Sequence, residues 1–430
     1  MAHHCQSLAG TLGLGTLTSW NFQHFYTLFK MRRHTNPPGR WLPLCELRTL
    51  PTLPAGINRI MTANPTRNLS ESQGDFIKLV YLVLACNEEA VIQKTILNLQ
   101  KAMLPDDMLI VVADNCDDAT ADIAKDTDAI VLVREDRSCP GKSAALIWMV
   151  DHHAELIGSY DYVVILDADS IVSENFSLAL HRNMNKTNQA LQCQLVPSEF
   201  EGSPISSLSA LSEIIEQNVF QRLRSLLGLS VRLRGTGMVF KSDVLIKFVP
   251  KLQTNVEDIA LSLLLVEGKV KIHALRSPVI YDPKPVDQNA GTRQRARWFR
   301  GQWSSLWVFK RTVLSLILRG PDGWSMFGSI YLKPRWLKIF ILTLLGLVSF
   351  PHFVIASICF CLVALDLLAI IIGITLLPHP GHFLKSMLHL PAFFMMWIRG
   401  IVLSFKSKNW LRARETKAGD TQVESDRVQD

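Results

Sequence analysis

The sequence lacks the cysteine spacings that build zinc sites and disulfide frameworks. Its eight cysteines include no C-x-x-C pair, the spacing typical of structural zinc sites. The N-terminus also lacks the order of basic, apolar and small residues that marks a secretory signal. We therefore expect reduced thiols in a reducing compartment.

Charged residues are scarce, at 19% of the chain, whereas hydrophobic residues make up 48%. That balance indicates membrane segments. The net charge is +7, and the basic residues concentrate at 293–338 and 399–414, on either side of the most apolar stretch. Charge in this position suits an anionic membrane surface. We expect the membrane as a partner and no nucleic acid.

From residue 78 onward, apolar runs of strand length alternate with helical segments. This alternation predicts an α/β fold with a doubly wound, mostly parallel sheet, in which ligands bind at the carboxyl ends of the strands. The expected strands are 78–85, 109–113, 129–133, 162–166, 190–195 and 236–240. The expected helices start at 88 and 257 and cover 119–125, 141–157, 205–227 and 289–316.

The composition divides the chain into six parts. They are a poorly structured leader (1–74), an α/β catalytic domain (75–316), an amphipathic connector (317–335), a transmembrane hairpin (336–377), an interfacial or membrane helix (378–410) and a polar tail (411–430). Residues 1–60 show no periodic apolar face, so we expect a chain starting at Met61 to be as active and stable as the whole.

The motif Asp167-Ala168-Asp169 closes an apolar strand. Two carboxylates with this spacing can reach a hard cation such as Mg²⁺ together with a substrate diphosphate. The alternative is a pair of acids that merely ends a strand at a loop. The position after the fourth strand of a β/α series favours the functional interpretation.

Polar residues also follow the first two strands, at Asn87-Glu88-Glu89 and at Asp114. Side chains there can hydrogen-bond a base and a ribose. Helix N-capping by Asn87 and Asp114 is the competing interpretation, and the two roles are compatible.

The segment Pro140-Gly141-Lys142-Ser143 opens a helix. A lysine and free backbone amides at a helix start suit a phosphate. The segment is not a Walker A loop, because Asp136 stands where that motif needs glycine. The pattern therefore excludes an ATPase of that class.

Two further clusters carry candidate chemistry. Glu257-Asp258 opens a helix, where a carboxylate facing the pocket could act as general base, or where two acids could simply favour a first turn. In Gln294-Arg295-Ala296-Arg297-Trp298, helical spacing places Gln294, Arg297 and Trp298 on one face. That face could hold a diphosphate and stack on a sugar ring. A basic amphipathic helix facing the membrane is the alternative.

In this order, these clusters resemble glycosyltransferase family 2, and more narrowly its cellulose, hyaluronan and poly-N-acetylglucosamine synthase-like branch. The resemblance covers about residues 78–307. It implies a GT-A fold, an inverting single displacement and a nucleoside-diphospho-sugar donor, with UDP as the expected carrier. It also implies Mg²⁺ or Mn²⁺ as cofactor.

The resemblance implies a role for each matching residue. The residues expected to bind the donor are Asn87, Glu88, Asp114, Lys142, Asp167, Gln294, Arg297 and Trp298. Asp169 and Asp167 are expected to bind the metal, and Asp258 is expected to be the general base. The acceptor side falls to Gly235, Thr236, Gly237 and Glu257, with glycines that let a sugar approach the backbone.

Three functions stay open. The first is a processive polysaccharide synthase, although polymer-secreting relatives carry spans ahead of the catalytic domain and this sequence shows none before residue 78. Export of a polymer would then need a partner protein or an oligomer. The second is a transferase that adds a single sugar to a lipid or glycan. The third is a non-catalytic sugar-nucleotide-binding scaffold.

The apolar stretch 336–377 is long enough for two spans of about 17–25 residues. Ser349–His352 is the expected turn, and Asp366 should face a helix partner or water because it is costly in lipid. Basic residues flank both ends, which predicts an integral inner-membrane or plasma-membrane protein with both flanks and the catalytic domain in the cytosol. One long tilted span is the alternative. The stretch 383–405 is expected to be interfacial, or a further span.

Overall fold

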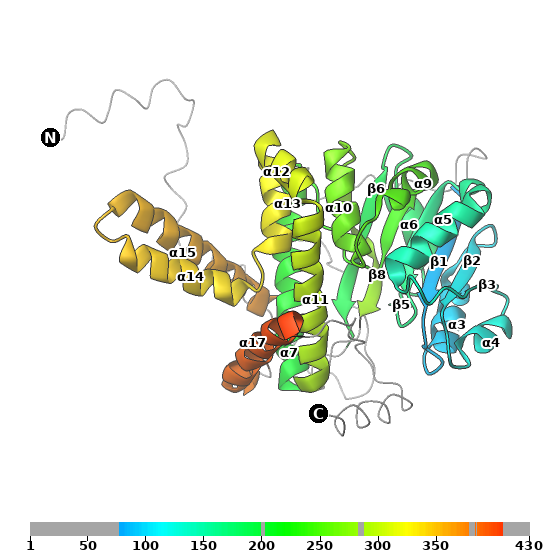
Figure 1. The fold of residues 1–430 in the computed structure, drawn as a ribbon, viewed down its shortest axis with the longest axis horizontal. Helices are drawn as coiled ribbons and strands as arrows, with labels where there is room; N and C mark the ends of the chain where they lie inside the picture. Colours follow the sequence, from blue (N-terminus) through cyan, green and yellow to red (C-terminus); the bar gives the residue numbers. More distant parts are fainter. Residues whose placement is uncertain (1–76, 199–202, 283–287, 378–382, 384, 407–430) are drawn as a thin grey trace, which may run out of the picture. The chain divides into compact units, whose positions relative to one another are not determined.

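The computed structural model describes residues 77–198, 203–282, 288–377, 383 and 385–406. The proposed leader (1–74) and the polar tail (411–430) lie outside these residues. The described chain is built around an eight-stranded sheet with the order β3-β2-β1-β4-β7-β6-β8-β5 (Figure 1).

One half of the sheet is parallel and follows the sequence prediction. It contains β1 (Leu79–Ala85), β2 (Met108–Asp114), β3 (Ile130–Arg134) and β4 (Tyr162–Asp167). Strand β1 lies between β2 and β4, and every residue of β1 is buried. A strand buried on both faces needs apolar residues throughout, which explains its continuous apolar run.

The other half of the sheet is mixed. It contains β7 (Met238–Lys241), β6 (Ala190–Pro197), β8 (Ile272–Asp282) and β5 (Ile171–Val172). Strand β7 runs antiparallel to both β4 and β6. The apolar period of a strand does not encode its direction, so the sequence could not show this reversal. The expected strand 236–240 begins two residues later, which leaves Thr236 in the preceding loop.

Helices cover both faces of the sheet. One core contains side chains of α3 (Ile92–Ala102), α4 (Thr120–Lys125) and α6 (Phe176–Asn183). The opposite core contains side chains of α5 (Lys142–Gly158), α9 (Ser242–Phe248), α10 (Glu257–Glu267), α12 (Lys310–Arg319) and α13 (Pro321–Tyr331). The β/α alternation therefore yields the expected layers.

The long helices differ in detail from the prediction. The helix expected at 205–227 consists of α7 (Pro204–Ile214), a π-helical segment η1 (Ile215–Gln221) and α8 (Arg222–Leu226). The helix expected at 289–316 ends earlier, as α11 (Gln288–Val308), because Phe309 leaves helical geometry before α12 begins. The segment predicted as a connector, 317–335, contains helix α13.

The C-terminal apolar region forms α14 (Arg335–Val348), α15 (Phe353–Thr375) and α17 (Leu390–Lys406) (Figure 1). Helices α14 and α15 pack together on either side of the predicted turn, and α17 packs on α11. The segments Phe353–Thr375 and Met387–Lys406 are long and apolar enough to cross a membrane. Helix α14 has 14 residues, about 21 Å, which is shorter than a typical hydrocarbon core.

Asp366 lies on α15 and is 3% exposed. Its carboxylate forms an ion pair with Lys338 on α14, in which Nζ and Oδ2 lie 2.8 Å apart. The expectation that this acid faces a helix partner is confirmed. The pairing also explains how an acid is tolerated within an apolar helix.

Candidate active site

Hydrogen bonds connect the loop after β1 to the loop after β2. Asn87 and Asn115 take positive φ angles of 56° and 51°, a conformation that asparagine tolerates better than most residues. The Asn87 side chain accepts a bond from the Asp117 backbone at 2.7 Å, and the Glu88 backbone donates to Thr120 at 2.7 Å. Both residues thus lie at the carboxyl edge of the sheet.

Neither Asn87 nor Asp114 caps a helix. The N-cap positions of α3 and α4 are Val91 and Ala119, without side-chain caps. The capping interpretation is therefore wrong. Both helices begin several residues after the preceding strand ends, so Asn87 and Asp114 lie too early in the chain to cap them.

Asp114 is held by a buried arginine. Arg134 Nη1 lies 2.5 Å from Asp114 Oδ1, and both side chains are almost fully buried. The two residues face each other in the register of β2 and β3. Arg134 also bonds Asp136 and the Cys139 carbonyl, each at 2.8 Å. The arginine therefore fixes both the Asp114 carboxylate and the loop leading to α5.

Lys142 begins α5 and reaches three oxygens. Its Nζ lies 2.5 Å from Asp167 Oδ1, 2.6 Å from the Gly235 carbonyl and 3.2 Å from Glu257 Oε1. The two carboxylates raise the pKa of Lys142, although burial alone would lower it. Lys142 is therefore a cation at neutral pH, where it can meet a phosphate.

Asp167 ends β4 with its side chain 42% exposed. Its backbone N–H donates to Thr236 Oγ1 at 3.1 Å, and Thr236 also shares a 2.7 Å bond with Ser170. Thr236 thus ties the loop before β7 to the turn that carries Asp167 and Asp169. Asp169 is half-buried in that turn.

A metal would need an open site here. No cluster of three or more His, Cys, Asp or Glu side chains suited to a metal ion occurs within the described residues. Asp167 and Asp169 fit the other kind of site, in which one or two carboxylates share the cation with substrate phosphates and water. The exposure of Asp167 is consistent with that arrangement.

The two glycines of the Arg234–Gly237 loop differ. Both have positive φ angles, 84° at Gly235 and 66° at Gly237. A Cβ at Gly237 would lie 2.4 Å from Ile280 Cδ1, so core packing already requires glycine there. A Cβ at Gly235 would meet Glu257 Oε1 at an ordinary 3.7 Å. The space beside Gly237 is therefore filled by the core.

Glu257 is buried at the start of α10, next to Lys142. Burial, together with the nearby Asp258 and Asp167 carboxylates, raises its pKa to about 7 against the opposing charge of Lys142. Glu257 therefore titrates near neutrality and faces the side of the site that holds Lys142.

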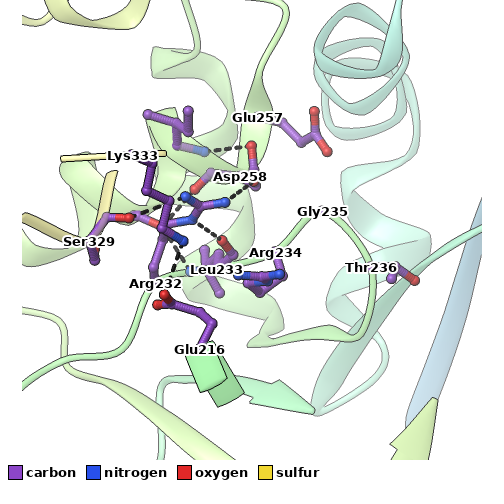
Figure 2. A network of polar contacts seen from close by, with 12 residues as sticks. Glu216, Arg232, Leu233, Arg234, Gly235, Thr236, Glu257, Asp258, Ser329 and Lys333 are labelled. Atoms are coloured by element: carbon purple, nitrogen blue, oxygen red, sulfur yellow. Dashed lines mark hydrogen bonds and ion pairs between the residues drawn. The ribbon is translucent and has the colours of Figure 1, made fainter. Parts of the chain in front are cut away.

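Asp258 follows in the first turn of α10. Its Oδ1 accepts from the Ile259 backbone at 2.8 Å, and its Oδ2 lies 3.8 Å from Arg232 Nη2 (Figure 2). Ser262 links Asp258 to Leu233, the residue after Arg232. Its hydroxyl donates to the Asp258 carbonyl and accepts from the Leu233 backbone N–H. The loop before β7 is thus anchored to the helix that presents Asp258.

Helix α11 carries the QRARW motif with its residues divided between two roles. Gln294, Arg297 and Trp298 line one cavity, as their spacing predicted. Arg295 lines the same cavity, but it is 2% exposed and also lies over the rings of Phe393 and Trp397 of α17, at 5.4 and 5.0 Å. The motif therefore joins the cavity wall to the C-terminal helices.

This cavity has a volume of about 1130 Å³. Its lining includes predicted site residues, namely Asp167, Thr236, Asp258, Gln294, Arg297 and Trp298. It also includes apolar side chains of the C-terminal helices, among them Phe340, Leu367, Ile370, Phe393 and Trp397. The two sets meet where the rings of Trp298 and Trp397 lie 6.5 Å apart. Asn87, Glu88, Asp114, Lys142, Asp169, Gly235, Gly237 and Glu257 are not part of its lining.

A polar cluster that the sequence did not reveal also lines the cavity, and Figure 2 shows part of it, with Glu216, Arg232 and Lys333. Glu216 on η1 is buried and pairs with Arg224 and Lys333 at 3.1 Å and with Arg335 at 3.3 Å. Burial would raise the pKa of Glu216, but these cations, Lys333 first, hold it well below 4.5. The partners are separated by up to 119 residues, so local spacing carries no signal of the cluster.

Comparison with known proteins gives the family. The family described as glycosyltransferase like family 2 matches residues 78–301, slightly more than half of the chain. The chain therefore belongs to glycosyltransferase family 2, and the predicted GT-A fold is confirmed. The narrower resemblance to cellulose and hyaluronan synthases stays a prediction.

Among curated proteins, the chain is similar to a beta-monoglucosyldiacylglycerol synthase of Trichormus variabilis. The two are 26% identical over 276 residues, which cover 62% of this chain and 58% of the synthase. The match thus spans less than two thirds of that relative.

Solved structures with a similar chain include two other transferases. A mannosyltransferase from Pyrobaculum calidifontis, in complex with GDP-Man and Mn²⁺, is 16% identical with a TM-score of 0.45, over 77% of this chain and 88% of that one. A glucosyl-3-phosphoglycerate synthase from Mycobacterium tuberculosis, in complex with Mn²⁺ and UDP, is 20% identical with a TM-score of 0.35, over 50% and 74%.

Proposed function

We propose that this protein transfers one hexosyl group from a nucleoside-diphospho-sugar, with UDP as the expected carrier, to a hydroxyl of a membrane lipid. The observation that carries the proposal is the lining of the cavity. It contains Asp167 and Asp258 together with apolar side chains of α14, α15 and α17. An acceptor that fills it would have a polar reacting end and an apolar tail.

The donor would lie at the carboxyl edge of β1, β2 and β4. Asp114 and the Asn87-Glu88 loop would meet the nucleoside, and Lys142 with Asp167 would lie beside the diphosphate. Asp167 and Asp169 would hold Mg²⁺ or Mn²⁺, which supplies stabilisation of the charge on the departing diphosphate. Gln294, Arg297 and Trp298 would contact donor phosphate and acceptor from α11.

Asp258 would take the proton of the attacking hydroxyl. The acceptor oxygen then forms the bond to the anomeric carbon while the bond to the diphosphate breaks, so the configuration inverts. General base catalysis of this type contributes about 10²–10⁴-fold in rate. The hydrogen bond from the Ile259 backbone holds the carboxylate of Asp258 in place.

Exposed apolar residues support membrane anchoring by the C-terminal helices. Phe340, Val348, Phe350 and Phe353 are between 62% and 80% exposed. A contiguous apolar surface of this kind is covered by lipid or by another protein. We infer an integral membrane protein whose catalytic domain faces the cytosol, with the domain bounds given above.

A processive polysaccharide synthase is the second candidate, favoured by the presence of Gln294, Arg297 and Trp298 in the cavity wall. The size of the product separates the two. In the polymerising case, labelled donor gives long chains. In the proposed case, it gives a lipid with one added sugar.

The test uses purified membranes with a panel of nucleotide sugars. We expect one donor to release nucleoside diphosphate and to label an organic-extractable lipid, with loss of both signals on chelation. Asp169→Asn should behave like chelated wild type. Full activity of Asp169→Asn in chelator would contradict the metal site, and donor binding without any turnover would favour the scaffold alternative.

A further inference from the structure

The cavity lining is rich in basic side chains, namely Arg224, Arg232, Arg234, Arg295, Arg297, Lys333, Arg335 and Lys338. The carboxylates in the lining are Asp167, Glu213, Glu216, Asp258 and Asp282, and Asp366 lies 3.8 Å from Arg335. Cations thus outnumber carboxylates in the lining, and their pairing is uneven.

The uneven pairing is clearest around Glu216. This single carboxylate serves three cations, Arg224, Lys333 and Arg335. Arg335 also reaches Asp366, but at 3.8 Å, and Asp366 already pairs with Lys338 at 2.8 Å. Positive charge therefore exceeds negative charge beside Lys333.

Arg232 adds to this excess. Its side chain is 13% exposed, and its nearest ion-pair partner among the described residues is Asp258, at 3.8 Å. Its other partners are the carbonyls of Leu233 and Ser329, at 3.2 and 3.4 Å. A guanidinium carries five N–H donors, so Arg232 keeps bonding capacity toward the cavity.

The mutual repulsion of these cations is visible in Lys333. Burial together with the charges of Arg232, Arg234 and Arg335 lowers its pKa to about 7, against the attraction of Glu216. An anion in the cavity would relieve this repulsion and replace the lost water. Figure 2 shows Arg232 and Lys333 close together beside Asp258 and Glu216.

The contacts among these groups define the occupant. Asp258 lies 3.8 Å from Arg232, and Glu216 joins Lys333 to Arg335. Arg335 in turn reaches Asp366 on α15, the helix whose apolar side chains, Ile370 among them, also line the cavity. We propose that the acceptor is a lipid whose headgroup carries both a phosphate diester and a free hydroxyl. The phosphate binds Arg232, Lys333 and Arg335, the hydroxyl reaches Asp258, and the acyl chains lie against the apolar side chains of the lining.

This inference rests on the proposed function and narrows its acceptor class. The headgroup oxygen bonds to the anomeric carbon, its proton passes to Asp258, and the electron pair of the broken bond leaves with the nucleoside diphosphate. The phosphate diester stays intact throughout. The cations therefore select the acceptor and take no part in bond breaking.

The test measures transfer from labelled nucleotide sugar by the full-length protein in phosphatidylcholine vesicles. The vesicles contain equal mole fractions of phosphatidylglycerol, of neutral diacylglycerol or of phosphatidic acid, which is anionic but has no headgroup hydroxyl. A fourth arm supplies glycerol 3-phosphate without acyl chains. We expect phosphatidylglycerol to be preferred over diacylglycerol by at least about tenfold, the effect of one charge-assisted hydrogen bond.

Variants separate recognition from folding. Lys333→Met and Arg232→Gln should lower this preference by about tenfold, whereas Lys333→Arg should retain most of it. Lys385→Met is the matched control, because Lys385 is exposed near the C-terminal helices and outside the cavity lining. The thermal midpoints of these four variants identify any that fails to fold. If Lys333→Met or Arg232→Gln does not fold, the inference is tested by Lys333→Arg and by the lipid preference of the wild type.

Several outcomes overturn the inference. Equal or better transfer to diacylglycerol by wild type would show that the cations do not recognise phosphate. Equal loss with both lipids in Lys333→Met would assign the cations to structure alone. Equal transfer to glycerol 3-phosphate would show that the acceptor needs no acyl chains and is not recognised as a lipid. If no lipid is labelled while a glycan acceptor is, the proposed function itself fails.

Discussion

Lys142 and Asp167, which come from the start of α5 and the end of β4, form an ion pair of 2.5 Å at the carboxyl edge of the sheet. Glu257 approaches the same ammonium at 3.2 Å. One cation thus holds two carboxylates in position. A donor diphosphate with its metal would compete for the same groups, so we expect donor binding to rearrange these three side chains.

We expect Lys142→Met to weaken donor binding by at least about tenfold, because a charge-assisted hydrogen bond to phosphate is lost. Glu257 would also lose its one neutralising partner, so its pKa should rise. Titration calorimetry with the nucleoside diphosphate and metal measures the first effect. Lys125→Met, which changes an exposed lysine on α4, is the control. Unchanged affinity in Lys142→Met would remove this lysine from the donor site.

Glu257 predicts a pH dependence with a definite sign. Its pKa is raised to about 7 in the folded protein, from an ordinary value of 4.5. The folded state therefore holds a proton that the unfolded state releases between these values, and stability from this group is lost as pH rises through about 7. Thermal midpoints between pH 5 and 8 should fall less steeply for Glu257→Gln than for wild type. Identical slopes would show that Glu257 is ionised throughout.

Asp258→Asn tests the base. The amide keeps the size of the side chain and can still accept the bond from Ile259, but it cannot take a proton. Transfer should fall by at least about 10²-fold while donor affinity is nearly kept. Single-turnover rates and donor titration separate the two quantities. A collapse of donor affinity with normal turnover per bound donor would make Asp258 a donor-binding residue.

Glu216→Gln should destabilise the protein by about 3–5 kcal/mol, the usual cost of breaking a buried ion pair from one side. Arg224, Lys333 and Arg335 would be left together without their shared carboxylate. The pKa of Glu216 is depressed in the folded state, so its stabilisation is present above about pH 4.5 and is lost as pH falls further. Chemical unfolding near pH 7 and pH 4 measures both effects. Glu155→Gln, which alters an exposed acid on α5, should change neither.

The sequence predicts much of this fold because apolar periodicity reports burial. Strand β1 and helix α10 are found where continuous apolar runs and a first-turn acid pair indicated them. Strand β7 shows the limit, since its pattern marks burial and leaves its antiparallel direction open. The end of α11 at Val308 has no signal in the sequence, because no glycine or proline stands between Gly301 and Gly320.

The candidate site divides in the same way. Asp167, Asp258 and Trp298 could be selected from motifs, since each stands at a strand end, a helix start or a helical face. Arg134 could have been found only from the register that places it opposite Asp114. The pairing of Glu216 with Lys333 joins distant parts of the chain through tertiary packing alone. Local patterns thus identify reacting groups, whereas the groups that position them depend on the fold.

Membrane topology can be tested at the turn between α14 and α15. Phe350 in this turn is 72% exposed, and basic residues flank the helix pair on both sides. Positive-inside bias places both flanks in the cytosol, so the turn should reach the outer side. Because α14 has 14 residues, its crossing requires local thinning of the bilayer or helical extension beyond Val348, at a modest cost per ångström of mismatch.

The measurement is cysteine labelling with an impermeant reagent, in a variant that lacks the native cysteines. A probe at Pro351→Cys should react from outside in intact cells, whereas probes at Ser325→Cys and Lys408→Cys should react only after permeabilisation. External labelling at 408 but not at 351 would refute the hairpin and support a single crossing. External labelling at both would mean that Met387–Lys406, the second segment long and apolar enough to span, also crosses. In that case the helix expected at the interface would be a third span.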